Sequence, residues 1–360
     1  MIVDNIPRYF RSLHRQARQK IARQSIWGFA NLYLGQKFKL KPSTMHTEIT
    51  ETLQFATNTR YQMMAFTGPK GYFHCELAAL AYPLWSIVND TEKFIVIIAD
   101  KEQVRDSLDR IKNELQFNPL LKKDFPAIAG KNTGHWNRLG FTTKNNIKVQ
   151  AFGFHQRYRP LRFLGSCPSS VIVNIPDDHY ISFLTHGLSN WISNFKALLS
   201  DNRDEQTNIV TVGSFCDMPQ SLLTSMFQKD EFPGWTMKWY NALPYESQET
   251  ELWYKWGELI HDKATYYDQG GPEAARRFFD DHKEKMLKGT QVLWPEHENY
   301  YDLMVYQQRY GKGEFMLRKQ NKKASHWVHQ QRIKRMREQM AQLQAEFENS
   351  EDIDMAHPSD

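Results

Sequence analysis

Short hydrophobic runs alternate with longer stretches of helical periodicity along much of the chain. The runs cover residues 63–66, 93–99, 170–175 and 208–214. A continuous apolar run of this length is typical of a strand buried on both faces of a parallel sheet. Helical spacing follows the second run over residues 100–121 and the third over residues 183–199. The alternation predicts an α/β fold with a mainly parallel sheet, flanked by helices and joined by right-handed crossovers.

Other stretches add elements around this sheet. Residues 130–152 predict a β-hairpin with its turn at Asn145 and Asn146. Residues 6–23 predict an amphipathic helix whose arginine face is either solvated or a nucleic-acid contact, and residues 24–60 are also expected to be helical. Helices are predicted over 272–286 and 297–312, beyond an aromatic-rich stretch. The expected organisation is a helical lead-in (1–60), an α/β domain (61–323), a basic helix (324–347) and an acidic disordered tail (348–360).

Composition places the chain among ordinary globular proteins. Apolar residues make up 41% and charged residues 24% of the 360 residues, and the net charge is +5. Three widely spaced cysteines (Cys75, Cys167 and Cys216) argue against a disulfide framework and fit a reducing compartment. No run approaches the roughly 18 apolar residues of a membrane span, and no apolar segment follows the basic N-terminus. We therefore expect a cytoplasmic protein that does not contact a membrane.

The turn after the first hydrophobic run has the context of a phosphate-binding loop. A strand, the turn Gly68-Pro69-Lys70-Gly71 and a helix beginning near Leu77 would aim backbone N–H groups at an anion. Gly68 to Cys75 matches the spacing of the pattern G-x-x-x-x-G-K-[ST]. However, Phe73 replaces its second glycine, His74 its lysine and Cys75 its magnesium-binding hydroxyl. The loop is either a degenerate nucleotide site or a structural remnant that positions a helix.

The carboxyl ends of the predicted strands locate the expected site. Ligands of parallel α/β sheets bind at these ends, which here are residues 67–75, Asp100, 174–178 and 213–217. A zinc site made of His74, Cys75 and Cys167 matches no known ligand spacing, so no metal site is predicted. The pair Asp177 and Asp178 is either an acid–base or metal group or a solvated turn at the end of a strand.

The order of these pieces resembles the ATPase half of the large terminase subunit of tailed phages, which translocates DNA into capsids. The resemblance covers about residues 28–323. Pro69-Lys70-Gly71 resembles the opening of its phosphate loop, residues 168–177 its Walker B strand and Gly213-Ser214 its coupling motif. Gln156, Arg159 and Arg162 resemble a basic loop of the family, and residues 293–296 resemble the segment that closes the ATPase domain. The resemblance implies a P-loop NTPase-like fold.

The departures from the family pattern bear on activity. His74 lacks the fixed charge of the usual lysine, and Cys75 is a poor ligand for magnesium. Asn174 replaces a Walker B carboxylate, and Asp177, at the position of the catalytic glutamate, is one methylene shorter. Four such changes predict a pseudo-ATPase. If the site is still active, the resemblance implies Lys70 and Asp177 as catalytic residues, with ATP and Mg²⁺ as cofactors.

Clustered basic residues predict contact with DNA. Residues 318–337 carry eight Lys or Arg and no Asp or Glu, and solvation alone rarely needs such a run. An acidic partner or the acidic tail is the competing explanation. The expected DNA-binding residues are Arg159, Arg162, Lys319, Lys322, Lys323, Arg332, Lys334, Arg335 and Arg337.

Three functions are compatible with these patterns. The first is a terminase-like DNA-packaging or DNA-handling protein of phage or prophage origin, without a nuclease site, which binds double-stranded DNA or a partner motor, portal or nuclease protein. The second is an ATPase-fold scaffold or interaction module in a protein assembly, with nucleic acid incidental. The third is an active packaging ATPase that uses Lys70 and Asp177. The predicted nucleotide-binding set is Gly68, Pro69, Lys70, Gly71, His74, Cys75, Asn174, Asp177, Asp178, Gly213 and Ser214.

Overall fold

The computed structural model describes residues 14–35, 37–99, 101–130, 136–153, 160–175, 203–214, 232–261 and 271–321, with a few single positions between 196 and 227. Several predictions lie outside these residues: the first half of the N-terminal helix, most of the 183–199 helix, the basic helix 324–347 and the acidic tail. Arg159, Asp177, Asp178 and the predicted DNA-binding residues from Lys322 onward also lie outside them.

An eight-stranded sheet forms the centre of the molecule, and the predicted α/β fold is confirmed. Its order is β3-β4-β5-β2-β6-β7-β1-β8. The strands from β5 to β8 pair in parallel, while β3, β4 and β5 pair antiparallel as the predicted hairpin at one edge. The bounds are β1 (Met63–Thr67), β2 (Phe94–Ala99), β3 (Trp136–Asn137), β4 (Gly140–Thr142), β5 (Lys148–Gly153), β6 (Ser170–Ile175), β7 (Asn208–Gly213) and β8 (Thr236–Trp239).

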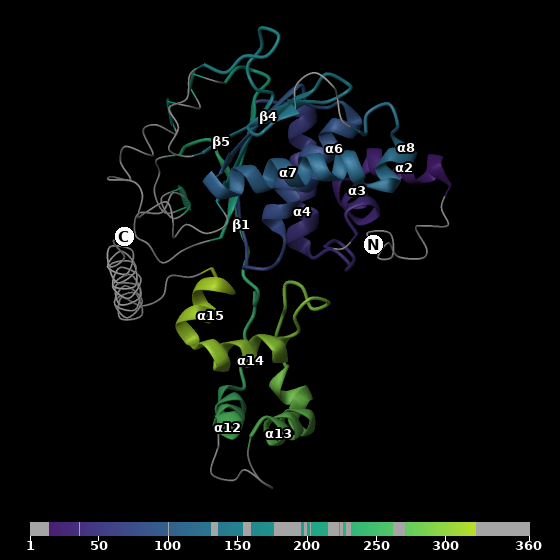
Figure 1. The fold of residues 1–360 in the computed structure, drawn as a ribbon. Helices are drawn as coiled ribbons and strands as arrows, with labels where there is room; N and C mark the ends of the chain where they lie inside the picture. The colour runs from purple at the N-terminus through teal and green to yellow at the C-terminus, as the bar shows by residue number, and fades with distance from the viewer. Residues whose placement is uncertain are drawn as a thin grey trace, which may run out of the picture.

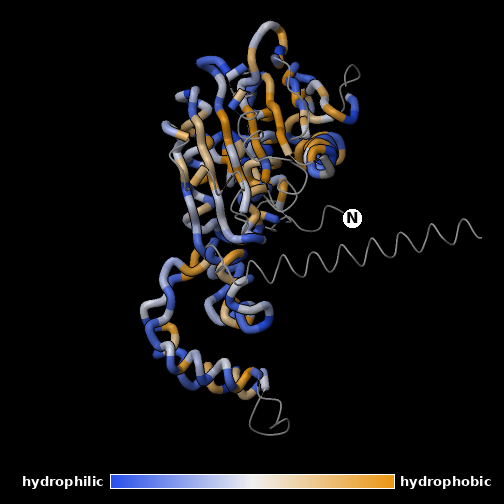
Figure 2. The backbone as a smooth tube through the Cα atoms, turned by 90° about the vertical axis from the view of Figure 1, so that its left-hand side faces the viewer, coloured by the Kyte–Doolittle hydropathy of each residue, from blue (hydrophilic) through white to orange (hydrophobic). Residues whose placement is uncertain are grey.

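Helices cover one face of this sheet (Figure 1). They are α2 (Arg15–Gln24), α3 (Ile26–Tyr33), α4 (Thr44–Thr59), α5 (His74–Glu76), the π-helix η2 (Leu77–Ala81), α6 (Tyr82–Asn89), α7 (Lys101–Phe117) and α8 (Pro119–Asp124). Met64 and Phe66 of β1 face the core beneath these helices, whereas Ala65 faces the core on the opposite side. The central strands are hydrophobic along much of their length (Figure 2), as burial on both faces requires. The lead-in helices α2–α4 belong to the same core as the sheet.

The helix predicted over residues 100–121 is divided in two. Helix α7 ends at Phe117, and α8 begins at Pro119. Proline disfavours helical geometry at the preceding residue. Asn118 accordingly adopts an extended conformation, and its Oδ1 accepts hydrogen bonds from the backbone N–H groups of Leu120 and Leu121, both at 3.0 Å. Pro119, which the prediction from hydrophobic periodicity did not take into account, therefore sets the boundary between α7 and α8.

Arg18, on the predicted arginine face, has neither of the roles expected for that face. Arg18 is 4% exposed, and its guanidinium pairs with the buried carboxylate of Asp124 on α8, with Nε at 2.7 Å from Oδ2. Arg15 donates to the backbone carbonyl of Asp124 at 2.9 Å. Tyr33 donates to the same carboxylate at 2.9 Å. These two arginines attach the lead-in to the sheet domain, Arg18 through a buried ion pair and Arg15 from an exposed position.

Four further helices form a lobe beside the carboxyl end of β1 (Figure 1). They are α12 (Thr250–His261), α13 (Gly271–Met286), α14 (Tyr300–Tyr310) and α15 (Lys312–Arg318). Trp256, Ala275, Phe279 and Met286 form a small core of their own. The stretch predicted as one helix over 297–312 is divided at Gly311, whose φ of +86° ends α14.

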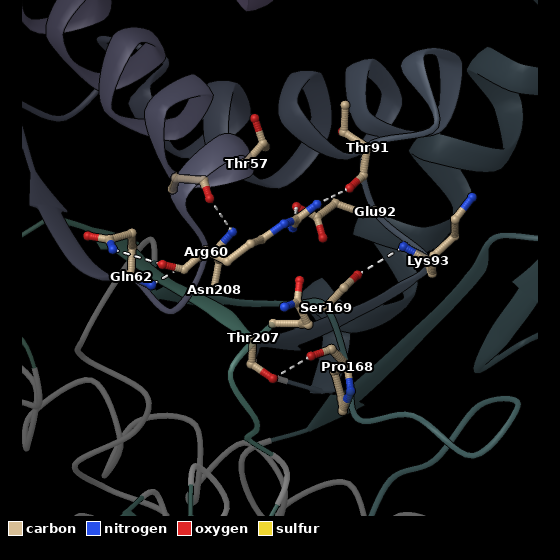
Figure 3. Close-up of polar contacts among 12 residues, drawn as sticks. Thr57, Arg60, Gln62, Thr91, Glu92, Lys93, Pro168, Ser169, Thr207 and Asn208 are labelled. Atoms are coloured by element: carbon tan, nitrogen blue, oxygen red, sulfur yellow. Dashed lines mark hydrogen bonds and ion pairs between the residues drawn. The ribbon is translucent and has the colours of Figure 1, made fainter.

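The amino ends of the strands are closed by a separate polar network (Figure 3). Arg60, just before β1, donates to Glu92, just before β2, at 2.8 Å. Thr207 donates to the carbonyl of Pro168 at 2.8 Å, and Ser169 accepts from the N–H of Lys93 at 2.9 Å. These contacts join residues that precede β1, β2, β6 and β7, on the edge opposite the phosphate-loop-like turn. None of the described helices has the length and apolar character needed to span a bilayer.

Candidate functional site

The loop after β1 has a non-glycine residue, Phe73, at a position whose backbone conformation favours glycine. Gly71 has a φ of +89°, but Phe73, at the position of the second glycine of the motif, has a φ of +60° in the left-handed region. That conformation is uncommon for a bulky side chain. Phe73 packs against Phe38 and Trp294, at ring-centroid distances of 6.5 and 6.1 Å. Packing of the aromatic ring therefore compensates for the strained backbone.

His74 points into the protein. It is 2% exposed, and its Nε2 lies 2.9 Å from the carbonyl oxygen of Gly213 at the end of β7. Because a carbonyl only accepts, Nε2 carries the proton and Nδ1 is left as an unprotonated acceptor. Burial is the main cause of a lowered pKa for His74, so the ring is neutral at pH 7. A neutral, inward-facing imidazole thus stands where the motif has a lysine charge.

The end of β7 contacts the loop a second time. The Ser214 hydroxyl donates to the carbonyl of Gly68 at 3.2 Å. At Gly213 a Cβ would lie 2.1 Å from the carbonyl oxygen of Ile175, so only glycine allows this approach of β7 to β6. The structure therefore brings together four residues of the predicted nucleotide-binding set: Gly68, His74, Gly213 and Ser214. They contact one another through two hydrogen bonds, from His74 to Gly213 and from Ser214 to Gly68.

Cys75 and Asn174 meet at a small pocket of about 210 Å³ between η2, α7 and β6. Glu76, Asp106 and Arg110 are also in its lining. The pKa of Glu76 is lowered even though burial opposes ionisation, because the ammonium of Lys37 lies 3.0 Å away. Asn174 is 8% exposed, and its Oδ1 has no hydrogen-bond partner within the described part of the chain.

The two motif positions in this pocket, Cys75 and Asn174, do not supply the ligands that hold magnesium in nucleotide sites. Magnesium in nucleotide sites is held by hard oxygen ligands that include a carboxylate or hydroxyl. Cys75 offers a thiol and Asn174 a neutral amide at the corresponding positions. No group of three His, Cys, Asp or Glu side chains within the described residues is arranged to hold a metal ion. We therefore derive no metal-dependent step for this site.

An aromatic and histidine cluster holds the outer side of the loop. His46 Nε2 donates to the carbonyl of Tyr72 at 2.7 Å, while its Nδ1 accepts from the N–H of Ser43 at 3.1 Å. Burial lowers the pKa of His46 to about 4. Trp294 contacts His46 edge-on at 4.5 Å and stacks on His297 at 4.6 Å between centroids. These contacts link the loop to the lead-in and to the segment before α14.

Lys70 and Lys319 lie on the side of the loop nearest the helical lobe. The Lys70 N–H donates to the carbonyl of Arg318 at 2.8 Å, which fixes the loop backbone to the end of α15. Lys319 is 6% exposed, and its Nζ lies 2.7 Å from both carboxylate oxygens of Glu298. The ammonium also lies 5.5 Å from the Tyr72 ring centroid. Lys319 is therefore a buried cation paired with Glu298, and not an exposed basic side chain of the kind expected to contact DNA.

Arg162 is the remaining described member of that set. It is exposed, and its guanidinium donates to the carbonyl of Leu161 at 2.8 Å. It lies in the segment that leads to β6, outside the lining of the pocket that Cys75 and Asn174 share.

Several residues at the site were not predicted from sequence. Glu76, Asp106 and Arg110 surround the small pocket, and Asp106 and Arg110 form an i,i+4 ion pair at 3.6 Å on α7. The i,i+4 spacing was visible in the sequence, but it is equally typical of a solvated helix face. His297 carried no signal in the sequence, because Tyr72 and Phe73, the rings that it contacts, lie more than two hundred residues earlier. Glu298 carried none because its partner is the buried Lys319, at the end of α15.

Comparisons with known proteins give similarity in structure only. No protein-family profile and no curated protein sequence matches this chain. The structure is similar to the large terminase of bacteriophage HK97, at 15% identity over 70% of this chain and 50% of that chain, with a TM-score of 0.39. The chain therefore spans about half the length of the HK97 protein.

Two further solved structures are similar to this chain. The ATPase domain of the Thermus phage P74-26 large terminase has 13% identity, 80% coverage of this chain, 96% coverage of that chain and a TM-score of 0.37. The Phi-28 DNA packaging motor has 9% identity, 66% and 68% coverage and a TM-score of 0.31.

Proposed function

We propose that this chain is a terminase-like DNA-packaging or DNA-handling protein whose ATPase-type site no longer hydrolyses ATP. The observation that carries the loss of hydrolysis is the hydrogen bond from His74 Nε2 to the carbonyl of Gly213. Phosphoryl transfer depends almost entirely on positioned positive charge around the transferred group. Here the side chain at the lysine position is neutral, buried and committed to the protein backbone.

The opposite side of the site supports the same conclusion. Asn174 carries no charge to hold a metal ion, and Cys75 offers a soft sulfur ligand. Restoring hydrolysis would require several changes at once, since the metal ligand and the phosphate-binding charge are both replaced. ATP and Mg²⁺ would be cofactors only if Lys70 and Asp177 supply what the other positions lack.

The proposed partner is double-stranded DNA, together with another motor, portal or nuclease subunit in the host cytoplasm. The support is the order of terminase-like motifs along the sequence and the run of basic residues at 318–337. Lys319 is excluded from this run because it is buried against Glu298. A ring or other oligomer is compatible with this role.

One observation favours a scaffold as the second candidate. The loop contacts three different parts of the protein: β7 through His74, the lead-in through Tyr72, and α15 through Lys70. Through these contacts the loop connects the sheet to the helical lobe. It could therefore be retained for assembly geometry, with nucleic acid incidental.

The test is equilibrium binding of ATP with magnesium to the full chain by calorimetry, followed by phosphate release with and without duplex DNA. We expect no binding and no release. Turnover that disappears in Lys70→Ala would overturn the pseudo-ATPase and restore the motor. A salt series on duplex DNA then separates the two candidates: affinity that falls steeply with salt favours DNA handling, and salt-insensitive binding of a protein partner favours the scaffold.

A further inference from the structure

A large pocket lies at the hairpin edge of the sheet, away from the phosphate-loop-like turn. It has a volume of about 780 Å³ and is lined by the hairpin of β3–β5 and by Phe163. Thr142 pairs with Lys148 across the hairpin, and Gly140 pairs with Gln150. These four residues share one face, because side chains alternate along a strand and the two pairs are two residues apart. The pocket is therefore one face of the hairpin, closed on one side by the segment before β6.

The lining of this pocket is positively charged. Among the described residues, this lining contains Arg138 and Lys148 and no Asp or Glu. The Lys148 ammonium lies between two aromatic rings, 4.7 Å from the Phe94 centroid and 5.6 Å from the Phe163 centroid. Burial lowers the pKa of Lys148, with no charged group contributing. Lys148 is partly exposed, and none of the described carboxylates forms an ion pair with it.

The turn beside Phe163 is strained in a way that exposes a hydrophobic side chain. Phe163 and Ser166 exchange two backbone hydrogen bonds of 3.0 Å around Leu164 and Gly165. Both central residues have positive φ, +50° for Leu164 and +85° for Gly165. Asn or Gly is the usual residue in the first position of such a turn. Leu164 instead occupies it and is 78% exposed.

We propose that this pocket binds the sugar–phosphate backbone of a DNA strand, with Lys148 and Arg138 contacting phosphate and Phe163 and Leu164 contacting sugar or base. The inference rests on the proposed DNA-handling function and identifies a contact surface for it. The volume is in the range of pockets that hold a ligand of roughly nucleotide size.

Nucleic acid fits this surface better than an acidic protein segment does. Aromatic side chains next to basic ones are the combination that binds a DNA strand, because rings contact sugars and bases while cations contact phosphates. The pocket also presents the amide of Gln150, a neutral hydrogen-bond donor. An acidic peptide would use the cations but has no consistent partner for the rings.

The experiment measures binding of the full chain to a fluorescein-labelled duplex and to the matching single strand by anisotropy, over a series of salt concentrations. The variants are Lys148→Gln and Arg138→Gln. The control is Arg276→Gln, which removes the same charge from an exposed arginine paired with Asp280 on α13, in the helical lobe. We expect each pocket variant to weaken binding about fivefold and to reduce the salt slope by about one, and the control to bind as the unaltered protein does.

The second variant keeps the test valid if the first is unstable. Arg138 is exposed, and Arg138→Gln leaves the packing of Lys148 against Phe94 intact. Normal DNA binding by both pocket variants would overturn the pocket assignment and leave the proposed function standing. Failure of the unaltered protein to bind either DNA would overturn both. Polyglutamate is the competing probe: if the pocket variants lose its binding but keep DNA binding, the pocket belongs to an acidic protein partner and the proposal is wrong.

Discussion

The imidazole of His74 and the carbonyl of Gly213 are joined by a 2.9 Å hydrogen bond across the carboxyl edge of the sheet. This bond connects the loop after β1 to the end of the neighbouring strand β7. In a phosphate-binding loop the side chain at this position reaches toward the nucleotide. Here it reaches toward the protein, and the imidazole hydrogen-bonds to the neighbouring strand.

Replacing His74 with lysine should not recover ATP binding. The new ammonium would have to occupy a site that is 2% exposed, which we expect to lower the free energy of unfolding by about 3 kcal/mol. Urea unfolding and ATP calorimetry on His74→Lys check this. His261→Lys, at an exposed position on α12, is the matched control and should change stability by less than about 0.5 kcal/mol. Gain of ATP binding at unchanged stability would contradict the buried role of His74.

Stability should fall as the pH drops from about 6.5 toward 4. His46 has a pKa of about 4 when folded, against an ordinary value of 6.5, because burial disfavours the charged ring. In this window the unfolded chain binds a proton that the folded chain does not, so the free energy of unfolding rises with pH. His46 accounts for on the order of 3 kcal/mol of this change, and His74 and His297, whose pKa values are also lowered, act in the same direction.

The measurement is urea unfolding at a series of pH values for the unaltered protein and for His46→Gln. The glutamine variant should be less stable at pH 7 but should show a shallower dependence between pH 6.5 and 4. Equal slopes for the two proteins would mean that other groups, such as the carboxylates, dominate acid unfolding.

Breaking the buried ion pair between Arg18 and Asp124 should destabilise the protein strongly. Asp124 is fully buried and Arg18 is 4% exposed, so Asp124→Ala would leave a guanidinium without its counter-charge. We expect a loss of about 3–5 kcal/mol in chemical unfolding. Asp280→Ala is the control, because it breaks an exposed i,i+4 pair with Arg276, and such pairs contribute about 0–1 kcal/mol. Similar losses in the two variants would contradict the structural role of Arg18.

Gly213→Ala should disrupt the junction between β6 and β7. Its Cβ would lie 2.1 Å from the carbonyl of Ile175 and 2.5 Å from Leu223 Cδ1, a clash with backbone that rotation of a side chain cannot relieve. We expect a loss well above the roughly 1–3 kcal/mol of Gly311→Ala, where φ of +86° and ψ of 157° favour glycine but no atom lies within 4 Å. The midpoints of thermal unfolding of Gly213→Ala and Gly311→Ala compare the effect of a steric clash with that of backbone strain alone. A smaller effect at Gly213 would mean that β6 and β7 separate easily.

Local patterns in the sequence were sufficient for the main elements. The apolar runs at 93–99 and 170–175 became β2 and β6, and Asn145 and Asn146 became the turn of the hairpin. These features depend on burial of neighbouring residues and on backbone preference, both of which are local. The loop that begins at Gly68 was also predicted correctly to follow a buried strand, because the apolar run at 63–66 directly precedes it in the sequence. A loop that follows a strand lies at the carboxyl end of that strand, where ligands of parallel sheets bind.

The role of each charged or polar side chain was decided only by the tertiary structure. Arg18 and Lys319 are both predicted as basic surface residues, yet each is buried against a carboxylate. The partner of Arg18 is Asp124, which lies 106 residues away in the sequence. The partner of Lys319 is Glu298, in the segment before α14. His74 and Gly213 are 139 residues apart. The sequence by itself determined that a loop containing glycine and proline follows a buried strand of a mainly parallel sheet. Folding decided where its side chains point, because burial and charge pairing depend on neighbours that the strand order brings together from distant parts of the chain.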